Sequence, residues 1–226
     1  MAIISICNKK GGTGKSTMTI FLAAAFGRNG KKVLVIDTDS QHSIKSIWQA
    51  EDEPDLTPLF DLEVISPKFV LDVLKVKGDK YDLIFIDVPR STEDSTNAVL
   101  AQMITLCDIL LVPVLPSKMD VFSTIEFLKL VKEIEDFKAA NDLPFYVAGF
   151  LNKTRNIAED SLTKEVLADH GLSFLPFDLP AVKMFLYPSA FSSILDTKEG
   201  QNRFEKFYYE VDDILTQLEY NEESNN

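Results

Sequence analysis

The chain has 226 residues, 46% of them hydrophobic, and a formal net charge of −12. This length and apolar content suit one α/β domain with a large core. The longest apolar runs fall short of the roughly 18 to 20 residues that cross a bilayer, so we expect a cytoplasmic protein without membrane contact. The acidic balance excludes a surface that is basic throughout, but screening over about 8 Å at physiological salt permits a local basic patch.

Apolar, strand-like runs alternate along the chain with segments of helical spacing. The predicted strands span residues 3–7, 33–37, 83–87, 109–114 and 146–151. The predicted helices span residues 16–29, 43–50, 68–76, 94–106, 121–138, 158–170 and 201–219. Such alternation is typical of a doubly wound, mostly parallel sheet in a single α/β domain. We assign residues 1–220 to this domain and residues 221–226 to a flexible acidic tail.

A glycine-rich loop joins the first predicted strand to the first predicted helix. Its glycines let consecutive backbone N–H groups converge on one anion, and the following helix adds its positive N-terminal end. This geometry suits the phosphates of a nucleotide, as in a P-loop NTPase. Lys15 can supply charge to the phosphates, and the Ser16 hydroxyl can ligate Mg²⁺. The predicted cradle comprises Lys10, Gly11, Gly12, Thr13, Gly14, Lys15, Ser16 and Thr17.

The loop departs from the ordinary phosphate-binding pattern, because Lys9 stands where its first glycine is expected. The form Lys-Gly-Gly-Thr-Gly-Lys-Ser-Thr resembles the signature of the deviant Walker-type ATPases, the group that contains the ParA partition proteins and MinD. The resemblance implies that ATP and Mg²⁺ are the cofactors. It also implies a homodimer across ATP, in which Lys10 reaches the phosphates that the other subunit holds.

Three aspartates follow predicted strands, at the edge where open α/β sheets bind ligands. Asp37 and Asp39 share one face of an extended segment. Asp87 follows four apolar residues, which is typical of a Walker B carboxylate that holds Mg²⁺ directly or through water, although a capping role is the simpler alternative. The segment 37–41 is similar to the second ParA signature, with Ser40 in place of the usual proline. By that resemblance Asp39 orients the attacking water and Asp37 belongs to the nucleotide-sensing switch.

The segment 152–155, Asn-Lys-Thr-Arg, follows the fifth predicted strand, where a base-reading loop is expected. Readers of guanine carry an acidic acceptor at the fourth position of this motif, whereas Arg155 only donates, which favours ATP over GTP. The family resemblance implies adenine contact by Asn152, and residues 179–182 are similar to a second base-flanking loop. Arg90 departs from the family pattern and could approach the phosphate or face solvent.

The last predicted helix has an apolar stripe with acidic residues opposite, which indicates packing on the domain. A membrane-surface helix would need Lys and Arg on its polar face. Basic residues gather toward the C-terminal third and are candidates for DNA contact, with solvated helix faces as the simpler alternative. These candidates are Lys183, Lys198, Arg203 and Lys206.

The sequence resembles the small ParA proteins: because the first predicted strand begins at residue 3, we expect no DNA-binding domain before it. The resemblance implies plasmid or chromosome partitioning by an ATPase whose catalytic residues are Lys10, Lys15 and Asp39. It further implies nonspecific DNA binding and nucleoid association in the ATP state, with hydrolysis stimulated by a ParB-like centromere-binding or adaptor protein. No finger arginine is evident in the motifs, and such a group is worth about 10³ to 10⁵ in rate, so turnover should be slow without an activator.

Two other functions share the deviant loop. One is a MinD-like ATPase that positions a protein cargo or a division regulator, which the motifs do not separate from partitioning. The remote one is a bacterial tyrosine kinase, suggested by Tyr208, Tyr209 and Tyr220 near the C-terminus. Tyr208 belongs to the apolar stripe of the last helix, which argues against the kinase.

Overall fold

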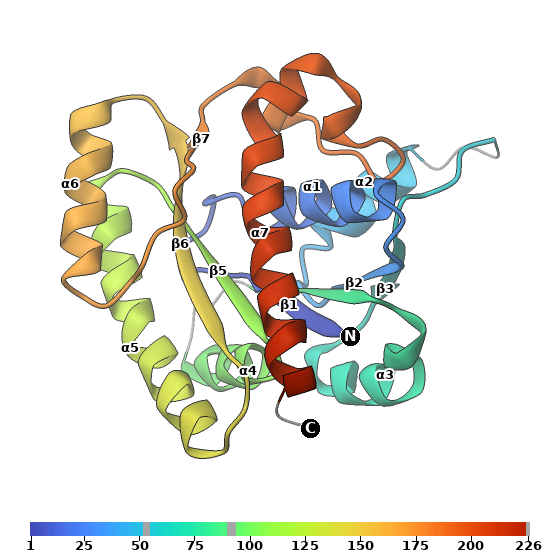
Figure 1. Cartoon of the computed structure of the whole chain (residues 1–226), viewed down its shortest axis with the longest axis horizontal. Helices are drawn as coiled ribbons and strands as arrows, with labels where there is room; N and C mark the ends of the chain where they lie inside the picture. The colour runs from blue at the N-terminus through green and yellow to red at the C-terminus, as the bar shows by residue number, and fades with distance from the viewer. Residues whose placement is uncertain (52–54, 90–93, 225–226) are drawn as a thin grey trace.

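The computed structural model describes residues 1–51, 55–89 and 94–224. At its centre is a parallel seven-stranded sheet with the strand order β3-β2-β4-β1-β5-β6-β7 (Figure 1). The strands are β1 (Ala2–Ile6), β2 (Val33–Asp37), β3 (Asp61–Val64), β4 (Leu83–Asp87), β5 (Ile109–Val114), β6 (Tyr146–Thr154) and β7 (Leu179–Pro180). Strands β2, β3 and β4 lie on one side of β1 in the sheet, and strands β5, β6 and β7 lie on the other side. The switch point therefore lies beside β1, where open α/β sheets bind ligands.

Seven α-helices occur in the described part of the chain, and short 3₁₀ helices join several elements. The α-helices are α1 (Lys15–Arg28), α2 (Ser43–Glu51), α3 (Val70–Lys77), α4 (Asp94–Thr105), α5 (Lys118–Ala140), α6 (Ile157–Ala168) and α7 (Lys198–Ser224). The 3₁₀ helices are η1 (Pro67–Phe69), η2 (Gly78–Lys80), η3 (Lys183–Leu186) and η4 (Ile194–Asp196).

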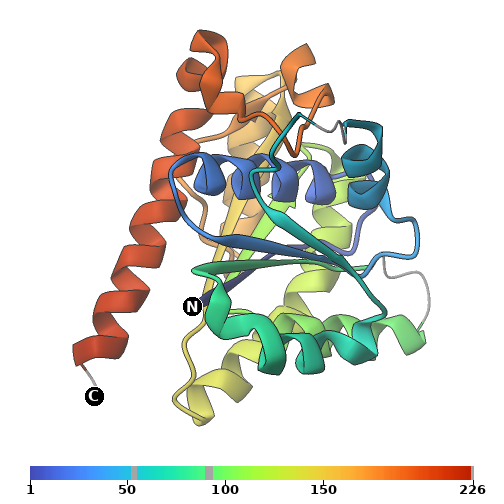
Figure 2. The ribbon, with the colours of Figure 1, turned by 90° about the vertical axis from the view of Figure 1, so that its right-hand side faces the viewer.

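The helices cover both faces of the sheet and enclose two apolar cores. One core joins the sheet to α1, α2 and α7, and the other joins it to α3, α4, α5 and α6. Figure 2 shows α1 and α3 on opposite sides of the strands. Because both faces are covered, the central strands β1, β2, β4 and β5 are buried along their whole length, as their continuous apolar runs predict.

The five predicted strands are confirmed, and two short strands at the sheet edges were missed. The predicted ranges 33–37, 83–87 and 109–114 coincide with β2, β4 and β5. β3 alternates acidic with apolar side chains over only four residues and β7 has only two residues, so both patterns are too short to stand out in the sequence. The α/β class and the mostly parallel sheet are therefore confirmed.

Two predicted helices are longer in the structure. α5 begins at Lys118 because the Ser117 hydroxyl caps it, accepting from the backbone N–H of Asp120 at 3.2 Å. α7 packs its apolar stripe into the core, including Tyr208, whose ring centroid lies 4.8 Å from that of Phe26. It runs to Ser224 and so extends into the stretch that the sequence assigns to a tail. No helix in the described ranges has the length and apolar character that crossing a membrane requires.

Candidate nucleotide-binding site

The predicted site residues meet at the carboxyl edge of the sheet. The glycine-rich loop follows β1, and β2 and β4 deliver Asp37 and Asp87 as register partners on its side. β6 brings Asn152 to the other side of the loop, where its side-chain amide donates to the Thr13 carbonyl at 2.8 Å. Residues from three other strands thus surround the loop that follows β1. Arg90 lies outside the described residues, so the choice between an approach to phosphate and exposure to solvent stays open.

The loop has the backbone conformation of an anion cradle. Gly12 and Gly14 have φ values of 79° and 98°, in the left-handed region that favours glycine. Gly14 precedes α1 and provides no side-chain cap, which leaves the first N–H groups of the helix available to an anion. This agrees with the predicted role of residues 10–17 in holding phosphates.

Lys10 and Lys15, the two lysines of the loop with predicted functions, are linked through the backbone of Lys10. Its carbonyl accepts from the Lys15 ammonium group at 3.3 Å and from the Thr13 hydroxyl at 3.4 Å. Its N–H donates to the side chain of Asn8 at 3.3 Å. Asn8 in turn donates to the Pro113 carbonyl at 3.0 Å, which fastens the entrance of the loop to the end of β5. This role of Asn8 was not predicted from the sequence, because a lone asparagine before the loop carries no spacing signal.

Ser16 and Asp87, the residues predicted to hold Mg²⁺, are in direct contact. The Ser16 hydroxyl donates to one carboxylate oxygen of Asp87 at 2.8 Å, while the other oxygen is buried without a hydrogen-bond partner. Burial raises the pKa of Asp87 to about 7, against the lowering effect of the Ser16 hydrogen bond, and the charge of Asp37 raises it further. An orphaned buried carboxylate oxygen beside a hydroxyl is a donor set that fits Mg²⁺.

The protein side of this magnesium site is small. Within the described ranges, no three His, Cys, Asp or Glu side chains gather as a metal-binding cluster. The fit therefore relies on Ser16 and Asp87 together with oxygens that a bound nucleotide and water would supply, as is usual for Mg²⁺ at phosphate sites.

Asp37, the last residue of β2, and Asp39, in the turn that follows, are both buried and fix the path into α2. Asp37 accepts from the backbone N–H of Asp39 at 3.2 Å and from that of Lys45 at 3.3 Å. Asp39 accepts from the backbone N–H of Gln41 at 3.0 Å. Burial raises the pKa of Asp37, although these backbone hydrogen bonds oppose the shift. Asp37 thus ties β2 to α2, and its predicted part in nucleotide sensing stays a prediction, as does the water-orienting role of Asp39.

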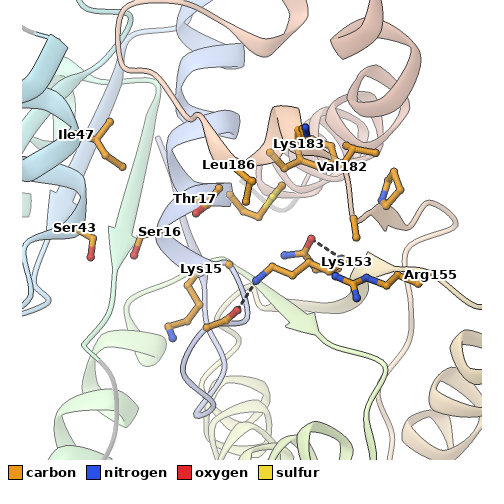
Figure 3. A pocket seen from close by; sticks show the side chains of 17 residues that line it. Lys15, Ser16, Thr17, Ser43, Ile47, Lys153, Arg155, Val182, Lys183 and Leu186 are labelled. Atoms are coloured by element: carbon orange, nitrogen blue, oxygen red, sulfur yellow. Dashed lines mark hydrogen bonds between the residues drawn. The ribbon is translucent and has the colours of Figure 1, made fainter.

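A cavity of about 580 Å³ extends from the loop toward β7 and η3 (Figure 3). Its volume lies within the usual range for small-molecule sites. The predicted base-flanking segment 179–182 reaches it through Pro180, Ala181 and Val182. The remaining lining residues are Gly12, Gly14, Lys15, Ser16, Thr17, Met18, Ser43, Ile47, Asn152, Lys153, Arg155, Lys183, Phe185 and Leu186.

The contributions of α2 and η3 to this cavity were not predicted from the sequence. Ser43 and Ile47 lie four residues apart on α2, so they share a helix face. Their spacing, directly after the aspartate pair, is the sequence feature from which their place in the cavity could have been predicted. The ring of Phe185, on η3, also packs against the ring of Phe21 on α1, with the two centroids 5.7 Å apart. No local pattern marks η3 as part of a site.

The four basic residues predicted to contact DNA do not share one environment. Lys183 lines the mouth of the cavity, whereas the other three lie on α7. Arg203 pairs with Glu199 at 3.3 Å, and the Lys206 ammonium group lies 5.6 Å from the centroid of the Phe177 ring. Lys198 is exposed. All four remain candidates.

The fold and the site define a phosphate-loop nucleotide-binding domain, and comparison with known proteins assigns its family. The model of the CobQ/CobB/MinD/ParA nucleotide binding domain matches residues 4–185. The chain therefore belongs to the ParA/MinD family of nucleotide-binding proteins.

Relatives and solved structures agree with this assignment. The maintenance of carboxysome distribution protein A of Halothiobacillus neapolitanus is 26% identical over 131 residues, which cover 57% of each chain. The chain thus spans little more than half the length of this curated relative. An ATP complex of McdA from Cyanothece has a TM-score of 0.67 at 18% identity and covers 92% of this chain and 96% of its own. The cell division ATPase MinD of Pyrococcus furiosus has a TM-score of 0.69 at 21% identity and covers 94% and 99%. At these identities the two structures show a shared fold.

Proposed function

We propose that the protein is an ATP-dependent, dimerising switch ATPase that partitions plasmid or chromosomal DNA. The observation that carries the proposal is the Ser16–Asp87 pair, with its orphaned carboxylate oxygen beside a left-handed glycine cradle. This arrangement suits a magnesium-bound nucleoside triphosphate. The McdA structure, which shares the fold, is a complex with ATP, and this supports adenine as the base.

In this proposal each site residue has a chemical role. Lys15 stabilises negative charge on the β- and γ-phosphates, and Ser16 with Asp87 would hold the Mg²⁺ that bridges them. Asp39, buried at the turn after β2, orients the water that attacks the γ-phosphate. Lys10 contacts the nucleotide of the partner subunit, with its backbone fixed by Asn8. Turnover is slow until a ParB-like partner stimulates it, and the acidic chain suits a basic segment of that partner.

The dimer can be tested by measuring the size of the Asp39→Ala protein with and without ATP and Mg²⁺. We expect a stable dimer that needs ATP, because nucleotide is bound but not hydrolysed. Adding Lys10→Ala should abolish this dimer while leaving ATP binding to the monomer. Lys9→Ala is the matched control for loss of a neighbouring positive charge. A protein that stays monomeric in every case would refute the nucleotide-dependent switch.

DNA binding in the ATP state is part of the proposal. It would bring a cytoplasmic protein onto the nucleoid whenever ATP is bound. Its test is retention on DNA at several salt concentrations, because each lost phosphate contact lowers the slope of log affinity against log salt by about 0.9. Lys183→Glu can be compared with the triple variant Lys198→Glu, Arg203→Glu and Lys206→Glu. If both variants bind DNA as the wild type does, these residues form no part of the surface.

A second candidate function is the positioning of a protein cargo. The similarity to a protein named for the maintenance of carboxysome distribution favours it. The nucleotide switch would be the same, and only the partner would differ. Neighbouring genes discriminate between the two: a small DNA-binding partner beside centromere-like repeats favours partitioning, and a gene for a component of a large protein assembly favours cargo positioning.

A further inference from the structure

The end of β6 departs from regular strand geometry beside the phosphate loop. Its pairing with β7 shifts register between Asn152 and Thr154. Lys153, at the shift, has a φ of 58°, one of three non-glycine residues in the described ranges with a positive φ. A left-handed backbone costs free energy for a residue with a Cβ, and such residues persist where surrounding contacts fix them.

Two hydrogen bonds join this part of β6 to the phosphate loop, while the Lys153 backbone N–H donates to the Asn152 side chain at 2.9 Å. The Lys153 ammonium group donates to the Gly12 carbonyl at 3.0 Å, and the neighbouring Asn152 donates to the Thr13 carbonyl at 2.8 Å. A Cβ on Gly14 would lie 2.4 Å from the same Asn152 amide nitrogen. One irregular turn of β6 therefore touches three consecutive loop residues, although about 140 positions separate it from them in sequence.

These two hydrogen bonds orient the donors of the loop. In a trans peptide the C=O and N–H groups point in opposite directions. Holding the carbonyls of Gly12 and Thr13 toward β6 therefore turns the N–H groups of Thr13 and Gly14 away from β6. Orientation of consecutive N–H groups is what an anion cradle requires.

The stem of Lys153 serves the other end of the cavity. The side chain lines the cavity together with Pro180 and Val182. Figure 3 shows it reaching from β6 to the loop, with its nitrogen at the dashed contact. Long lysine stems cover apolar surface while the charged end stays at a polar partner. The stem of the exposed Lys153 would thus offer apolar surface to a base bound beside Pro180 and Val182.

We propose that Lys153 is a positioning residue that joins the two ends of the nucleotide site. Its ammonium group holds the Gly12 carbonyl and so aims the loop at the phosphates, and its stem forms part of the wall for the base. The inference rests on the proposed nucleotide binding and adds a residue outside the phosphate-loop motif to that site.

Two substitutions separate the roles of the ammonium group and the stem. Lys153→Met keeps most of the stem and removes the donor. Lys153→Gly removes both and relieves the left-handed backbone. Lys80→Met, on η2 at the opposite edge of the sheet, is the control. Binding of MgATP and of magnesium tripolyphosphate is measured by calorimetry, and the fluorescence of Trp48, the single tryptophan, on α2 next to Ile47, gives a second signal.

We expect Lys153→Met to weaken MgATP and tripolyphosphate equally, by about fivefold each, because one hydrogen bond to the loop is lost. Lys153→Gly should weaken MgATP by about 20-fold but tripolyphosphate by only about fivefold, since the wall for the base is lost as well. Its melting temperature without nucleotide should equal or exceed that of the wild type. A residue that only supports the fold would give the reverse, with a lower melting temperature and unchanged affinities.

Wild-type affinities in Lys153→Met would overturn the role of the ammonium group, and equal losses of both ligands in Lys153→Gly would overturn the role of the stem. A lower melting temperature of Lys153→Gly would overturn the claim that the left-handed backbone at this position costs free energy. Lys153→Met would still test the ammonium group in that case. Failure of the wild type to bind MgATP would instead refute the proposed function.

Discussion

The two ends of the nucleotide cavity are built in different ways. The phosphate end is one contiguous loop between β1 and α1, completed by Asp87 from β4. The base end is assembled from α2, the end of β6 and the segment from β7 to η3, which are far apart in the sequence. A contiguous loop can be recognised by the spacing of its residues, whereas an assembled wall exists only when the strands lie in the right order. The contact of Asn152 with the Thr13 carbonyl joins the two ends.

The largest effect should come from the phosphate end. Lys15→Ala removes a buried ammonium group that sits in the loop, hydrogen-bonded to the Lys10 carbonyl. We expect MgATP affinity to fall by about 100-fold, since hydrogen bonds to charged groups contribute about 1.5 to 3 kcal/mol each. Isothermal titration calorimetry measures this loss. An equal loss in Lys9→Ala would show that the general charge of the segment, rather than the Lys15 contact, determines affinity.

The junction between the two ends is tested at Gly14. Gly14→Ala forces a Cβ to within 2.4 Å of the Asn152 amide nitrogen at a φ of 98°. Gly30→Ala meets nothing within 4 Å at a φ of 87°, so it reports backbone strain alone. We expect Gly30→Ala to lower the free energy of unfolding by about 1 kcal/mol and Gly14→Ala to lower it by about 1 to 2 kcal/mol more.

Urea denaturation measures both values. Adding Asn152→Ala to Gly14→Ala should restore most of the difference, because it removes the atom that clashes. If the two alanine variants are equally stable, the contact between Asn152 and the loop is not tight.

The titration of Asp87 gives a pH-dependent effect at the phosphate end. Its pKa is raised from 3.8 to about 7, so between these values the folded protein binds a proton that the unfolded chain does not. The free energy of unfolding without nucleotide should therefore fall as the pH rises from 4 to 7, by at most about 1.4 kcal/mol per pH unit from this group. Asp37, whose pKa is also raised, contributes in the same direction.

The measurement compares denaturation curves of the wild type and Asp87→Asn at several pH values. The variant should lack the share of the slope that Asp87 contributes. Parallel slopes in the two proteins would show that Asp87 does not titrate in this range.

The smallest effect should come from the base end. Arg155→Asp places an acidic acceptor at the fourth position of the segment Asn152-Lys153-Thr154-Arg155, where it can accept from guanine N–H donors. We expect the ratio of GTP to ATP affinity to rise by about fivefold, because one hydrogen bond of modest strength is gained. Competition binding with the two nucleotides measures the ratio, and Arg155→Ala controls for loss of the guanidinium group. A ratio that is the same in both variants would mean that position 155 does not face the base.

The sequence by itself determined the phosphate end and the class of the fold. Glycine spacing in the loop, the apolar runs that became β1, β2, β4, β5 and β6, and an aspartate at the end of β4 are local patterns. Each of these patterns reflects the backbone conformation or the burial of a few consecutive residues. It can therefore be recognised without knowing which other segments pack against those residues. The same patterns led to the ParA/MinD family, which the match over residues 4–185 confirms.

Only the tertiary structure decided how the base end meets the loop. β3 and β7 are strands because the sheet offers them partners, since β3 alternates acidic and apolar residues over only four positions and β7 has only two residues. The contacts of Asn8 with Pro113, of Lys153 with Gly12 and of η3 with the cavity join segments far apart in the chain, and no spacing along the chain predicts them. Of the basic residues predicted to bind DNA, Lys183 lines the cavity and the other three lie on α7. Contacts between distant segments depend on strand order and register, which short-range sequence patterns do not specify.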